Sequence, residues 1–551
     1  MSHATLDELT RTVTAWTAQD PDPVTRRQAE ELLGRAQDGD PGARAELTDA
    51  FGSRLAFGTA GLRGALGAGP NRMNRVVVGQ AAAGLAAYLT THDAPGQQVL
   101  VGYDARHGSA RFARDTAEIL AAAGFATLLT AAPTPTPVVA FGIRHFGCAA
   151  AVVVTASHNP PQDNGYKVYL GDGSQIVPPA DAEIAAEIDR VAAGDLGAVP
   201  RSDAYRVVGE ELLDAYRNRV ASLVPTDAPR ELRWVYTPMH GVGGALVEQV
   251  VAAAGFPAPR VVAAQAEPDP DFPTVPFPNP EEPGAIDLAL AQAQAGETDL
   301  VVANDPDADR CAVATVVDGR WRMLSGDELG ALLGDDALRR GVRGTYACSV
   351  VSSTLLSRLA AASAQPYVAT LTGFKWIGRV PGLAFGYEEA IGYCVDPQAV
   401  PDKDGISALV RVLALTADLL ASGLTLADRL DEIARVHGVH HTSQLSVRVA
   451  DLGLIRDAMA RLRADPPSAL AGEPVEVTDL APGSAALPPT DGVLLRGAST
   501  QVVVRPSGTE PKLKCYLEVR EQPTADVDAA RRRAQDRMAG LRTEMSTALG
   551  L

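Results

Sequence analysis

Three aspartates alternate within one short segment, at Asp305, Asp307 and Asp309, directly after the apolar run of residues 300–303. In an extended segment alternate side chains lean to the same side, so the three carboxylates are expected to converge on one point. Carboxylates this close repel one another unless a cation neutralises them. Their oxygens, together with water and a phosphate oxygen, suit an octahedral Mg²⁺ ion. The spacing therefore predicts a hard-cation site, with a solvated acidic turn as the alternative.

A second candidate group is the hydroxyl of Ser157, which follows the apolar run of residues 149–154. Pro160 and Pro161 stiffen the segment after it, so the hydroxyl is expected to stand out at the end of a strand. A serine in this position is a candidate nucleophile or phosphate carrier. The alternative is an ordinary serine in a polar turn.

Two basic side chains near Ser157 are candidates for proton transfer. His158 is its neighbour in the sequence, and because adjacent side chains do not usually face one another, a Ser-His triad is not expected. Lys167 is the better candidate, since a lysine that is partly desolvated or near arginines can be tuned towards neutrality. Arginine fills most of the 49 basic positions, so each lysine is a notable choice. The lysines are Lys167, Lys375, Lys403, Lys512 and Lys514.

Two glycine-containing turns have the composition of anion sites. Residues 58–64 combine glycines with Arg63, which can bring backbone N–H groups and a guanidinium to an anion. Residues 505–512 follow an apolar run and hold an arginine, two hydroxyls, a glycine and a lysine, a composition typical of a phosphate cradle. A plain polar turn is the alternative for both. No lysine follows a glycine, so the nucleotide-binding P-loop motif does not occur.

The segments that must position these groups form an α/β pattern. Short Val-rich runs recur, each followed by a loop with Gly, Asp or Ser and then by Ala-rich helical sequence. The clearest runs are residues 99–101, 149–154, 233–236 and 300–303. In open α/β sheets, ligands bind beyond the carboxyl ends of the strands, where these loops fall. We therefore expect several similar α/β units that face one site.

The length of 551 residues is enough for three or four domains. A Gly/Pro stretch at residues 194–200, a turn at 318–319 and a change from helical to alternating pattern near 436–439 indicate the boundaries. The expected domains are residues 1–203, which include a helical extension over 1–50, then 204–318, 319–434 and 435–551. The last domain ends in a helical pattern and is expected to be a smaller α+β domain.

Charge and cysteine usage exclude several classes of function. The net charge of −18 disfavours a nucleic-acid or membrane-surface partner, whereas a small anionic substrate needs only a local positive patch. The five cysteines form no CxxC pair, which argues against a disulfide framework or a zinc knuckle. The first residues lack the apolar core of a signal peptide. We expect a cytoplasmic protein with a small-molecule partner, and the sequence leaves its oligomeric state open.

Taken together and in this order, the loops resemble those of the α-phosphohexomutase superfamily, the phosphoglucomutases and phosphomannomutases. Four segments carry the resemblance: residues 155–160 are similar to the phosphoserine loop, 305–310 to the metal loop, 386–389 to the sugar-binding loop and 505–510 to the phosphate-binding loop. The resemblance implies three similar α/β domains with a smaller C-terminal α+β domain around a central cleft. Each of the four expected domains would supply one of these loops.

The resemblance also implies a role for each residue of the loops. Ser157 would carry a phosphoryl group, and Mg²⁺ would be held by Asp305, Asp307, Asp309 and an oxygen of the phosphorylated serine. The groups that would assist the transfer are Lys167, Arg63, His158 and Arg310. The substrate-binding residues would be Arg106, Lys375, Glu388, Glu389, Arg505, Ser507, Gly508, Thr509 and Lys512. Glucose 1,6-bisphosphate would be the intermediate and activator.

The sugar loop departs from the pattern of many hexomutases. It lacks their serine and histidine, since Ala390 and Ile391 follow Glu389. In this it is similar to the branch that holds phosphoglucomutases, phosphopentomutases and sugar-bisphosphate synthases. We expect the interconversion of glucose 1-phosphate and glucose 6-phosphate, with mannose or pentose phosphates as the alternative. Two remote alternatives are a phosphatase with an aspartate nucleophile, for which Asp305 and Asp307 superficially fit, and a catalytically silent sugar-phosphate-binding protein.

Overall fold

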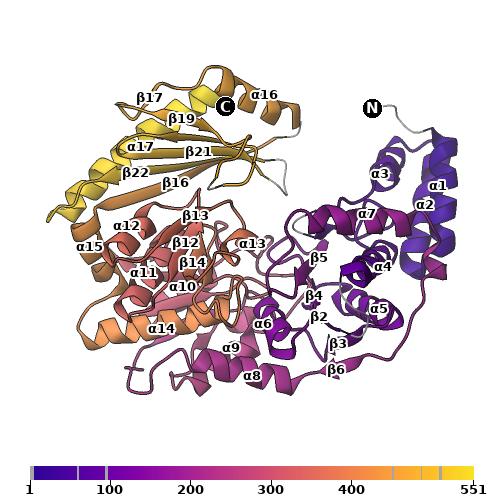
Figure 1. The fold of residues 1–551 in the computed structure, drawn as a ribbon, viewed down its shortest axis with the longest axis horizontal. Helices are drawn as coiled ribbons and strands as arrows, with labels where there is room; N and C mark the ends of the chain where they lie inside the picture. Colours follow the sequence, from indigo (N-terminus) through magenta and orange to yellow (C-terminus); the bar gives the residue numbers. More distant parts are fainter. Residues whose placement is uncertain are drawn as a thin grey trace. The chain divides into compact units, whose positions relative to one another are not determined.

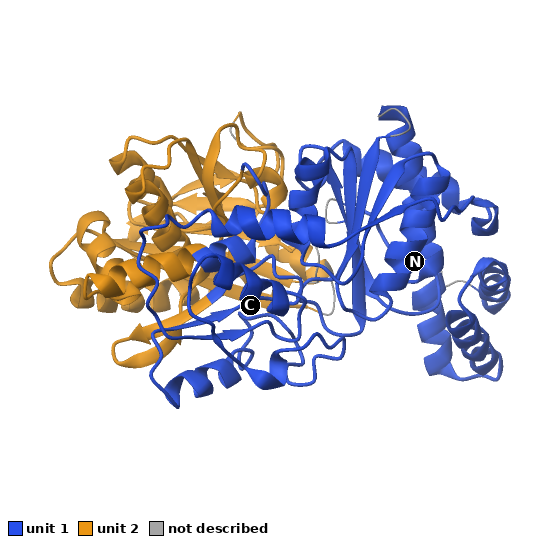
Figure 2. Ribbon diagram, turned by 90° about the horizontal axis from the view of Figure 1, so that it is seen from below, with its two compact units in different colours: residues 1–312, 398–410 blue, residues 313–397, 411–551 orange. Residues whose placement is uncertain are grey.

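The computed structural model describes residues 5–58, 61–92, 97–449, 452–485, 487–507 and 512–550. The chain folds into two compact units, which Figure 2 colours separately. Unit 1 comprises Met1–Ala312 and Gln398–Val410, and unit 2 comprises Val313–Pro397 and Arg411–Leu551.

Unit 1 contains a six-stranded sheet with the order β1-β5-β4-β2-β3-β6. Its strands are β1 (Leu62–Ala65), β2 (Gln98–Tyr103), β3 (Ala126–Thr130), β4 (Ala150–Val154), β5 (Asp163–Leu170) and β6 (Arg206–Val208). Strands β4, β2, β3 and β6 are parallel neighbours, and β5 runs antiparallel between β4 and β1. Every residue of β4 is buried, as expected for a parallel strand covered on both faces, and this explains its unbroken Ala/Val sequence.

Helices cover both faces of this sheet. They are α4 (Arg75–His92), α5 (Ser109–Ala122), α6 (Thr136–Phe146) and α7 (Ala180–Ala192). Figure 1 shows α4 and α5 on one side of the strands and α6 on the other. Before the sheet, α1 (Leu6–Gln19), α2 (Pro23–Gln37) and α3 (Pro41–Phe51) form a helical extension with a small core of its own. Trp16 packs edge-on against Phe51 in that core.

The remainder of unit 1 holds a second group of parallel strands. Strand β7 (Trp234–Thr237) pairs with β8 (Arg260–Val261) on one side and with β9 (Leu300–Ala303) on the other. The helices of this part are α8 (Glu210–Ala221), α9 (Gly244–Ala253) and α10 (Asp287–Gln294), and two short 3₁₀ turns span Leu196–Ala198 and Ala263–Gln265. The chain leaves β9 at Ala303, directly before the three aspartates.

Unit 2 contains a four-stranded sheet of order β13-β12-β14-β15. Its strands are β12 (Thr345–Ser349), β13 (Tyr367–Thr370), β14 (Leu383–Glu388) and β15 (Gly392–Cys394), and the hairpin β10 (Ala312–Val317) and β11 (Arg320–Met323) precedes them. Its helices are α11 (Gly326–Arg339), α12 (Leu355–Ala362), α13 (Phe374–Ile377) and α15 (Leu426–His437), and α14 (Gly405–Ala421) begins in unit 1. A Cβ at Gly330 would lie 2.5 Å from the Tyr387 ring, so glycine lets α11 pack closely on β14.

The end of unit 2 is an antiparallel sheet of order β16-β22-β21-β20-β19. Its strands are β16 (Val439–Arg448), β19 (Glu476–Asp479), β20 (Val493–Arg496), β21 (Thr500–Pro506) and β22 (Lys512–Glu521), accompanied by the short pair β17 (Ala469–Leu470) and β18 (Glu473–Pro474). Helices α16 (Leu452–Ala464) and α17 (Val527–Leu549) complete it, and Figure 1 shows α17 along β16 and β22. Residues of α17 spaced at helical intervals, such as Ala534, Met538 and Leu541, are buried in its core.

The α/β fold class predicted from the sequence is confirmed. The expected runs appear as β2, β4, β7 and β9, and the final helical pattern appears as α17. The domain boundaries at residues 203, 318 and 434 stay predictions. Among the described residues no single helix has the length and apolarity needed to cross a membrane. Helices α14 and α15 reach that length and apolarity only when they are taken together, and the pair is bent by 86°.

Candidate active site

The loop that follows β4 presents Ser157 through an unusual backbone conformation. Ser157 has φ +51°, in the left-handed region that non-glycine residues seldom adopt. The hydroxyl of Thr155, a fully buried residue, accepts a hydrogen bond of 2.8 Å from the Ser157 N–H and supports this turn. The Ser157 hydroxyl donates to Asp305 Oδ2 at 2.7 Å. The loop therefore points the candidate nucleophile at the first of the three aspartates.

Arg106 lies beneath this loop and is buried, with 4% of its surface exposed. Its guanidinium donates to the carbonyls of Ser157 (2.7 Å), Asn159, Pro160 (2.8 Å) and Asp163 (3.2 Å). The planar guanidinium group thus donates its hydrogen bonds to four backbone carbonyl oxygens. This arrangement indicates that Arg106 positions the loop, whereas its predicted contact with substrate stays a prediction.

The aspartate segment is a turn, so the expectation of an extended segment was wrong. The Ala308 N–H donates to the Asp305 carbonyl at 2.8 Å, and Ala308 has φ +55°. The turn brings together one carboxylate oxygen from each of Asp305, Asp307 and Asp309, all within 4.8 Å of one another. We call these three residues the carboxylate cluster. The predicted convergence is confirmed, but a tight turn produces it and the alternation of an extended chain does not.

The carboxylate cluster fits a hard cation. The three aspartates are 0%, 0% and 1% exposed. Asp307 Oδ1 and Asp309 Oδ1 are buried and have no hydrogen-bond partner within the described part of the chain. Buried carboxylate oxygens without partners are costly, and Mg²⁺ prefers oxygen ligands of this kind. Burial, reinforced by Asp307 and Asp309, raises the pKa of Asp305 well above its usual range.

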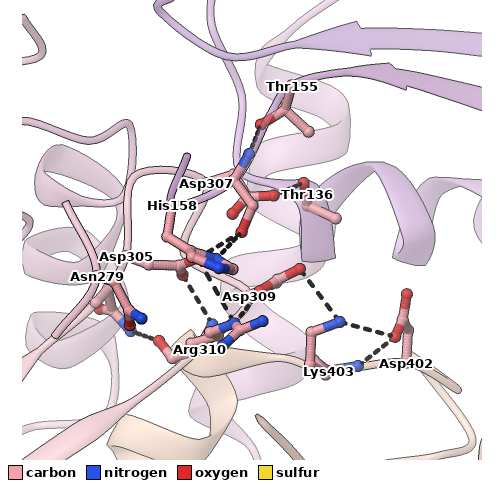
Figure 3. Close-up of polar contacts among 12 residues, drawn as sticks. Thr136, Thr155, His158, Asn279, Asp305, Asp307, Asp309, Arg310, Asp402 and Lys403 are labelled. Atoms are coloured by element: carbon pink, nitrogen blue, oxygen red, sulfur yellow. Dashed lines mark hydrogen bonds and ion pairs between the residues drawn. The ribbon is translucent and has the colours of Figure 1, made fainter. Parts of the chain in front are cut away.

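Several cationic side chains surround the cluster, as Figure 3 shows in part for Lys403 and Arg310. Lys167 Nζ lies 2.7 Å from Asp307 and 2.9 Å from Asp309. Lys403 Nζ lies 3.4 Å from Asp309, and Arg310 Nε lies 3.8 Å from the same side chain. Burial by itself would raise the pKa of Asp309, but Lys167, Lys403 and Arg310 outweigh it and hold this pKa far below its usual range.

The expectation that Lys167 is tuned towards neutrality was wrong. Desolvation does lower the pKa of Lys167, but the nearby carboxylates of Asp307 and Asp309 outweigh it, so that the pKa is raised overall. Burial and neighbouring arginines can be inferred from the sequence. The contact of Lys167, on β5, with two carboxylates from a loop far along the chain cannot. Lys167 is therefore a charged donor at the cluster.

His158 contacts Ser157 directly, contrary to expectation. Its Nδ1 lies 3.1 Å from Ser157 Oγ, because the left-handed backbone of Ser157 turns both side chains to the same side. Burial, followed by the charges of Arg310 and Arg63, lowers the pKa of His158 well below its usual range, so the imidazole is neutral. Arg63, on β1, donates to the Asn159 side chain at 3.2 Å and so also belongs to the serine loop's surroundings.

The sequence reasoning missed two members of this site. Lys403 was noticed only as one of the five lysines and was given no role, and Thr136 was not noticed. The Thr136 hydroxyl donates to Asp307 Oδ2 at 2.6 Å. A Cβ at Gly405 would lie 2.2 Å from the Arg310 carbonyl, so glycine lets the segment that carries Lys403 approach the aspartate turn. The scarcity of lysine was the signal that could have found Lys403.

The predicted sugar-binding residues lie in unit 2. Glu388 ends β14, and the carboxylate of Glu389 accepts hydrogen bonds from Ser349 (3.0 Å) and Ser352 (3.4 Å). Glu389 thus braces the loop after β12. Lys375 lies on the short helix α13, and its Nζ is 6.0 Å from the centroid of the Trp376 ring.

The predicted phosphate-binding turn joins β21 to β22, also in unit 2. Arg505 lies at the end of β21 and Lys512 begins β22. The Ser507 N–H donates to the Lys512 carbonyl at 2.8 Å, which closes the turn. Gly508 and Thr509 lie outside the described residues. Arg505, Ser507 and Lys512 are therefore brought together as the sequence predicted.

Known protein families match successive segments along most of this chain. Four family models match successive segments: the phosphoglucomutase/phosphomannomutase alpha/beta/alpha domains I, II and III over residues 54–194, 211–317 and 325–436, and the C-terminal domain over 447–534. A probable phosphomannomutase of Haemophilus influenzae is 48% identical, over 83% of this chain and 95% of its own. A phosphopentomutase of Mus musculus is 35% identical, over 92% of this chain and 90% of its own.

A solved structure of a phosphoglucomutase/phosphomannomutase family protein from Burkholderia thailandensis has the same fold. The TM-score is 0.70 at 21% identity, over 90% of this chain and 98% of that one. The predicted architecture of three α/β domains and a C-terminal domain is thereby confirmed. The chain belongs to the phosphoglucomutase/phosphomannomutase family of the α-phosphohexomutase superfamily, and it is an enzyme of the mutase type.

Proposed function

We propose that this enzyme moves a phosphoryl group between two positions of a sugar phosphate by way of a phosphorylated Ser157. The observation that carries the proposal is the hydrogen bond from Ser157 Oγ to Asp305, which places a nucleophilic hydroxyl at a buried carboxylate cluster. Phosphoryl transfer needs positioning and charge neutralisation more than covalent assistance, and both are available around Ser157.

The transfer runs in two balanced steps. In the first, a sugar hydroxyl attacks the phosphorus on Ser157, the bond from phosphorus to Oγ breaks, and a bisphosphorylated sugar forms. The proton of the sugar hydroxyl is lost as Oγ regains one. After the intermediate turns round, Ser157 Oγ attacks the other phosphoryl group and the first step is reversed at that end. Lys167, charged and beside the cluster, is our proton donor to Ser157 Oγ when this oxygen departs in the first step. In the second step Lys167 takes the proton back from Ser157 Oγ as this oxygen attacks.

Mg²⁺ is the proposed cofactor, and Asp305, Asp307 and Asp309 would hold it. It would neutralise charge on the phosphoryl group during transfer. Arg310, 3.8 Å from Asp309, adds a further positive charge at the cluster. His158 contacts Ser157 Oγ, and Arg63 contacts Asn159 of the same loop.

The residues of unit 2 are proposed to bind the part of the substrate that does not react. Arg505, Ser507, Gly508, Thr509 and Lys512 would hold the second phosphate through charge-assisted hydrogen bonds, and Glu388 and Lys375 would contact the sugar. Binding energy from this end would orient the reacting end. Glucose 1,6-bisphosphate, when the sugar is glucose, would be both intermediate and activator.

Glucose phosphate is our first candidate for the sugar. The relatives widen the choice, because one is named a probable phosphomannomutase and another a phosphopentomutase. We therefore propose mannose and pentose phosphates as the second candidates. The five cysteines are buried and form no disulfide in the described part of the chain, which supports our proposal of a reducing, cytoplasmic location.

The test is ³¹P NMR of each sugar 1-phosphate, incubated with the enzyme, Mg²⁺ and a trace of the matching bisphosphate. The expected result is growth of the terminal phosphate resonance, fastest for glucose. Faster conversion of mannose or ribose 1-phosphate would reassign the substrate. Release of inorganic phosphate alone would overturn the mutase in favour of an aspartate-nucleophile phosphatase. Binding without conversion of any sugar would indicate a catalytically silent protein.

A further inference from the structure

We propose that unit 2 carries a second binding site, for a small phosphorylated metabolite, in a cavity lined by Arg358, Arg496 and Arg520. The cavity has a volume of about 610 Å³. Its walls come from α12, from the loop after β12, from β13, and from the ends of β20 and β22 together with the start of β21. We call it the arginine cavity.

The arginine cavity is strongly positive. Arg358 and Arg496 are exposed and form no ion pair with any carboxylate of the described residues. Arg520 is more enclosed, with 15% of its side chain exposed, and Glu518 lies 3.5 Å away. No acidic side chain lines the cavity in the described part of the chain. Three guanidinium groups thus line one cavity, and Glu518 and Glu473 are the carboxylates that act on Arg520 from outside its lining.

The fixed contacts of these arginines leave donors for a ligand. Arg496 gives Nε and Nη2 to one acceptor, Gln501 Oε1, at 3.2 and 2.9 Å. Arg520 uses Nη2 on the carbonyls of Gly497 and Ala498, at 3.1 Å each, and donates from Nη1 to the Thr354 hydroxyl at 3.4 Å. Each guanidinium has five N–H donors, so Arg496 and Arg520 keep some for a phosphate. Desolvation, reinforced by the charges of Arg358 and Arg496, lowers the pKa of Arg520, although Glu518 and Glu473 act in the opposite direction. An anion would relieve the repulsion among the three.

The hydroxyls of the cavity suit the remainder of such a ligand. Ser357 donates to the Thr354 carbonyl at 2.6 Å, and Thr354 donates to Glu518 at 2.8 Å. Both protons are therefore used inward. The Thr354 hydroxyl oxygen also contacts Arg520 Nη1 at 3.4 Å and His440 Nδ1 at 3.3 Å, whereas the Ser357 oxygen keeps acceptor capacity. A ligand that brings phosphate for the arginines and a hydroxyl donor for the Ser357 oxygen matches both. A phosphorylated polyol or nucleoside has this chemistry.

The arginine cavity is separate from the phosphate-binding turn. The turn follows β21 and precedes β22, whereas Gln501 lies near the start of β21 and Arg520 near the end of β22. Lys512 and Arg520 are therefore separated by most of β22, which at about 3.3 Å per residue is roughly 25 Å. A phosphate held at the turn cannot reach the cavity. The two are independent anion sites at opposite ends of one hairpin.

The cavity also contacts the sugar-binding loop. Ser349 and Ser352 line it, and both donate to the carboxylate of Glu389, the neighbour of Glu388. A ligand that shifts these serines acts on the loop proposed to hold the sugar. The arginine cavity therefore lies where an effector site would lie. A ligand bound there would change sugar binding without occupying the sugar's own site.

The test is calorimetric titration of the full chain with inorganic pyrophosphate, in the absence of divalent cations. The wild type is expected to bind at two classes of site. The double variant Arg358→Gln/Arg496→Gln is expected to lose one class, with affinity weakened at least about tenfold, whereas Arg505→Gln loses the other. The matched control is Arg320→Gln/Arg532→Gln, which removes two exposed arginines elsewhere in unit 2.

Two results would overturn the proposal. One is that the double variant Arg358→Gln/Arg496→Gln binds pyrophosphate with the stoichiometry and affinity of the wild type. The other is equal weakening by the control pair, which would mean that only the overall charge matters. Because Arg358 and Arg496 are exposed, the variant is expected to fold, and its mutase activity without pyrophosphate reports this. Mutase failure of the wild type would count against the proposed function and would leave the pyrophosphate result standing.

Discussion

The ammonium of Lys403 lies 3.4 Å from Oδ2 of Asp309. Lys403 belongs to the segment Gln398–Val410, which returns to unit 1 after the chain has built much of unit 2. The same carboxylate also contacts Lys167 at 2.9 Å. Two lysines thus share one aspartate of the carboxylate cluster, and their charges compete with any cation held there.

We expect Lys403→Met to tighten Mg²⁺ binding and to slow the reaction. Loss of the ammonium removes a repelling charge beside the cluster, so the Mg²⁺ affinity should rise by about tenfold, which is ~1.4 kcal/mol. The same loss removes positive charge near the transferred phosphoryl group, so kcat should fall. Mg²⁺ titrations of activity and of the unfolding midpoint would measure both effects. Lys514→Met, on β22, is the control and should alter neither. Unchanged Mg²⁺ affinity in Lys403→Met would contradict this account.

Mg²⁺ is expected to stabilise the folded protein as well as activate it. A cation would relieve the repulsion among three buried carboxylates, and at a hundredfold excess over Kd the gain is about 2.7 kcal/mol. Chelation should abolish activity and lower the unfolding midpoint, and Asp307→Asn should lose most of the Mg²⁺-induced shift. Asp115→Asn removes a buried carboxylate that is paired with Arg75, so it should keep the shift although it is less stable. A shift of wild-type size in Asp307→Asn would argue against metal at the cluster.

Ser157→Ala should abolish the mutase reaction, because no other oxygen takes the place of Oγ. A fall of about 10³-fold or more is expected, together with loss of the phosphorylated form in intact-mass spectra after incubation with the bisphosphate. Ser174→Ala is the matched control, since Ser174 is also a buried serine of unit 1 and its hydroxyl donates to the Pro401 carbonyl at 3.3 Å. Substantial activity in Ser157→Ala would reassign the nucleophile.

Asp327 predicts a pH dependence of stability. Burial, reinforced by Glu389, raises the pKa of Asp327 to about 7, although the Ser353 N–H and the Tyr387 hydroxyl donate to it. Below about pH 4 the folded and unfolded states both hold the proton. Between about pH 4 and 7 the Asp327 carboxyl group is ionised in the unfolded chain but still protonated in the folded protein, so the free energy of unfolding falls as the pH rises. This fall levels off above about pH 7.

Asp327→Asn has no proton to lose and should escape this decline. Relative to the wild type, its free energy of unfolding should increase by about 3 kcal/mol from pH 5 to pH 8. Urea unfolding at several pH values would measure this. Asp335→Asn, on the same helix, instead loses an ion pair with Arg429 and should be destabilised without such a rise. A constant difference between Asp327→Asn and the wild type across this range would refute the prediction.

The local features of this protein are predictable from its amino-acid sequence. The unbroken apolar runs of β4 and β9 are typical of parallel strands buried on both faces, so their positions and the loops after them were predictable. The closeness of Asp305, Asp307 and Asp309 in the chain was enough to predict that they converge, although the turn that brings them together was not predicted. Arg505, Ser507 and Lys512 are also near neighbours in the chain, so their proximity was predictable for the same reason, and their binding of phosphate stays a prediction.

Contacts between residues far apart in the chain depend on the folded structure. The contact of Ser157 with Asp305, the two carboxylates against Lys167, and the approach of Lys403 all depend on the packing of separate segments. The charge state of Lys167 follows from that packing, since neighbouring carboxylates outweigh burial. The left-handed turns at Ser157 and Ala308 also depend on it, because neither residue type favours that backbone conformation without surrounding contacts. Local patterns name the reacting groups, but the electrostatic environment of each group is a property of the folded chain.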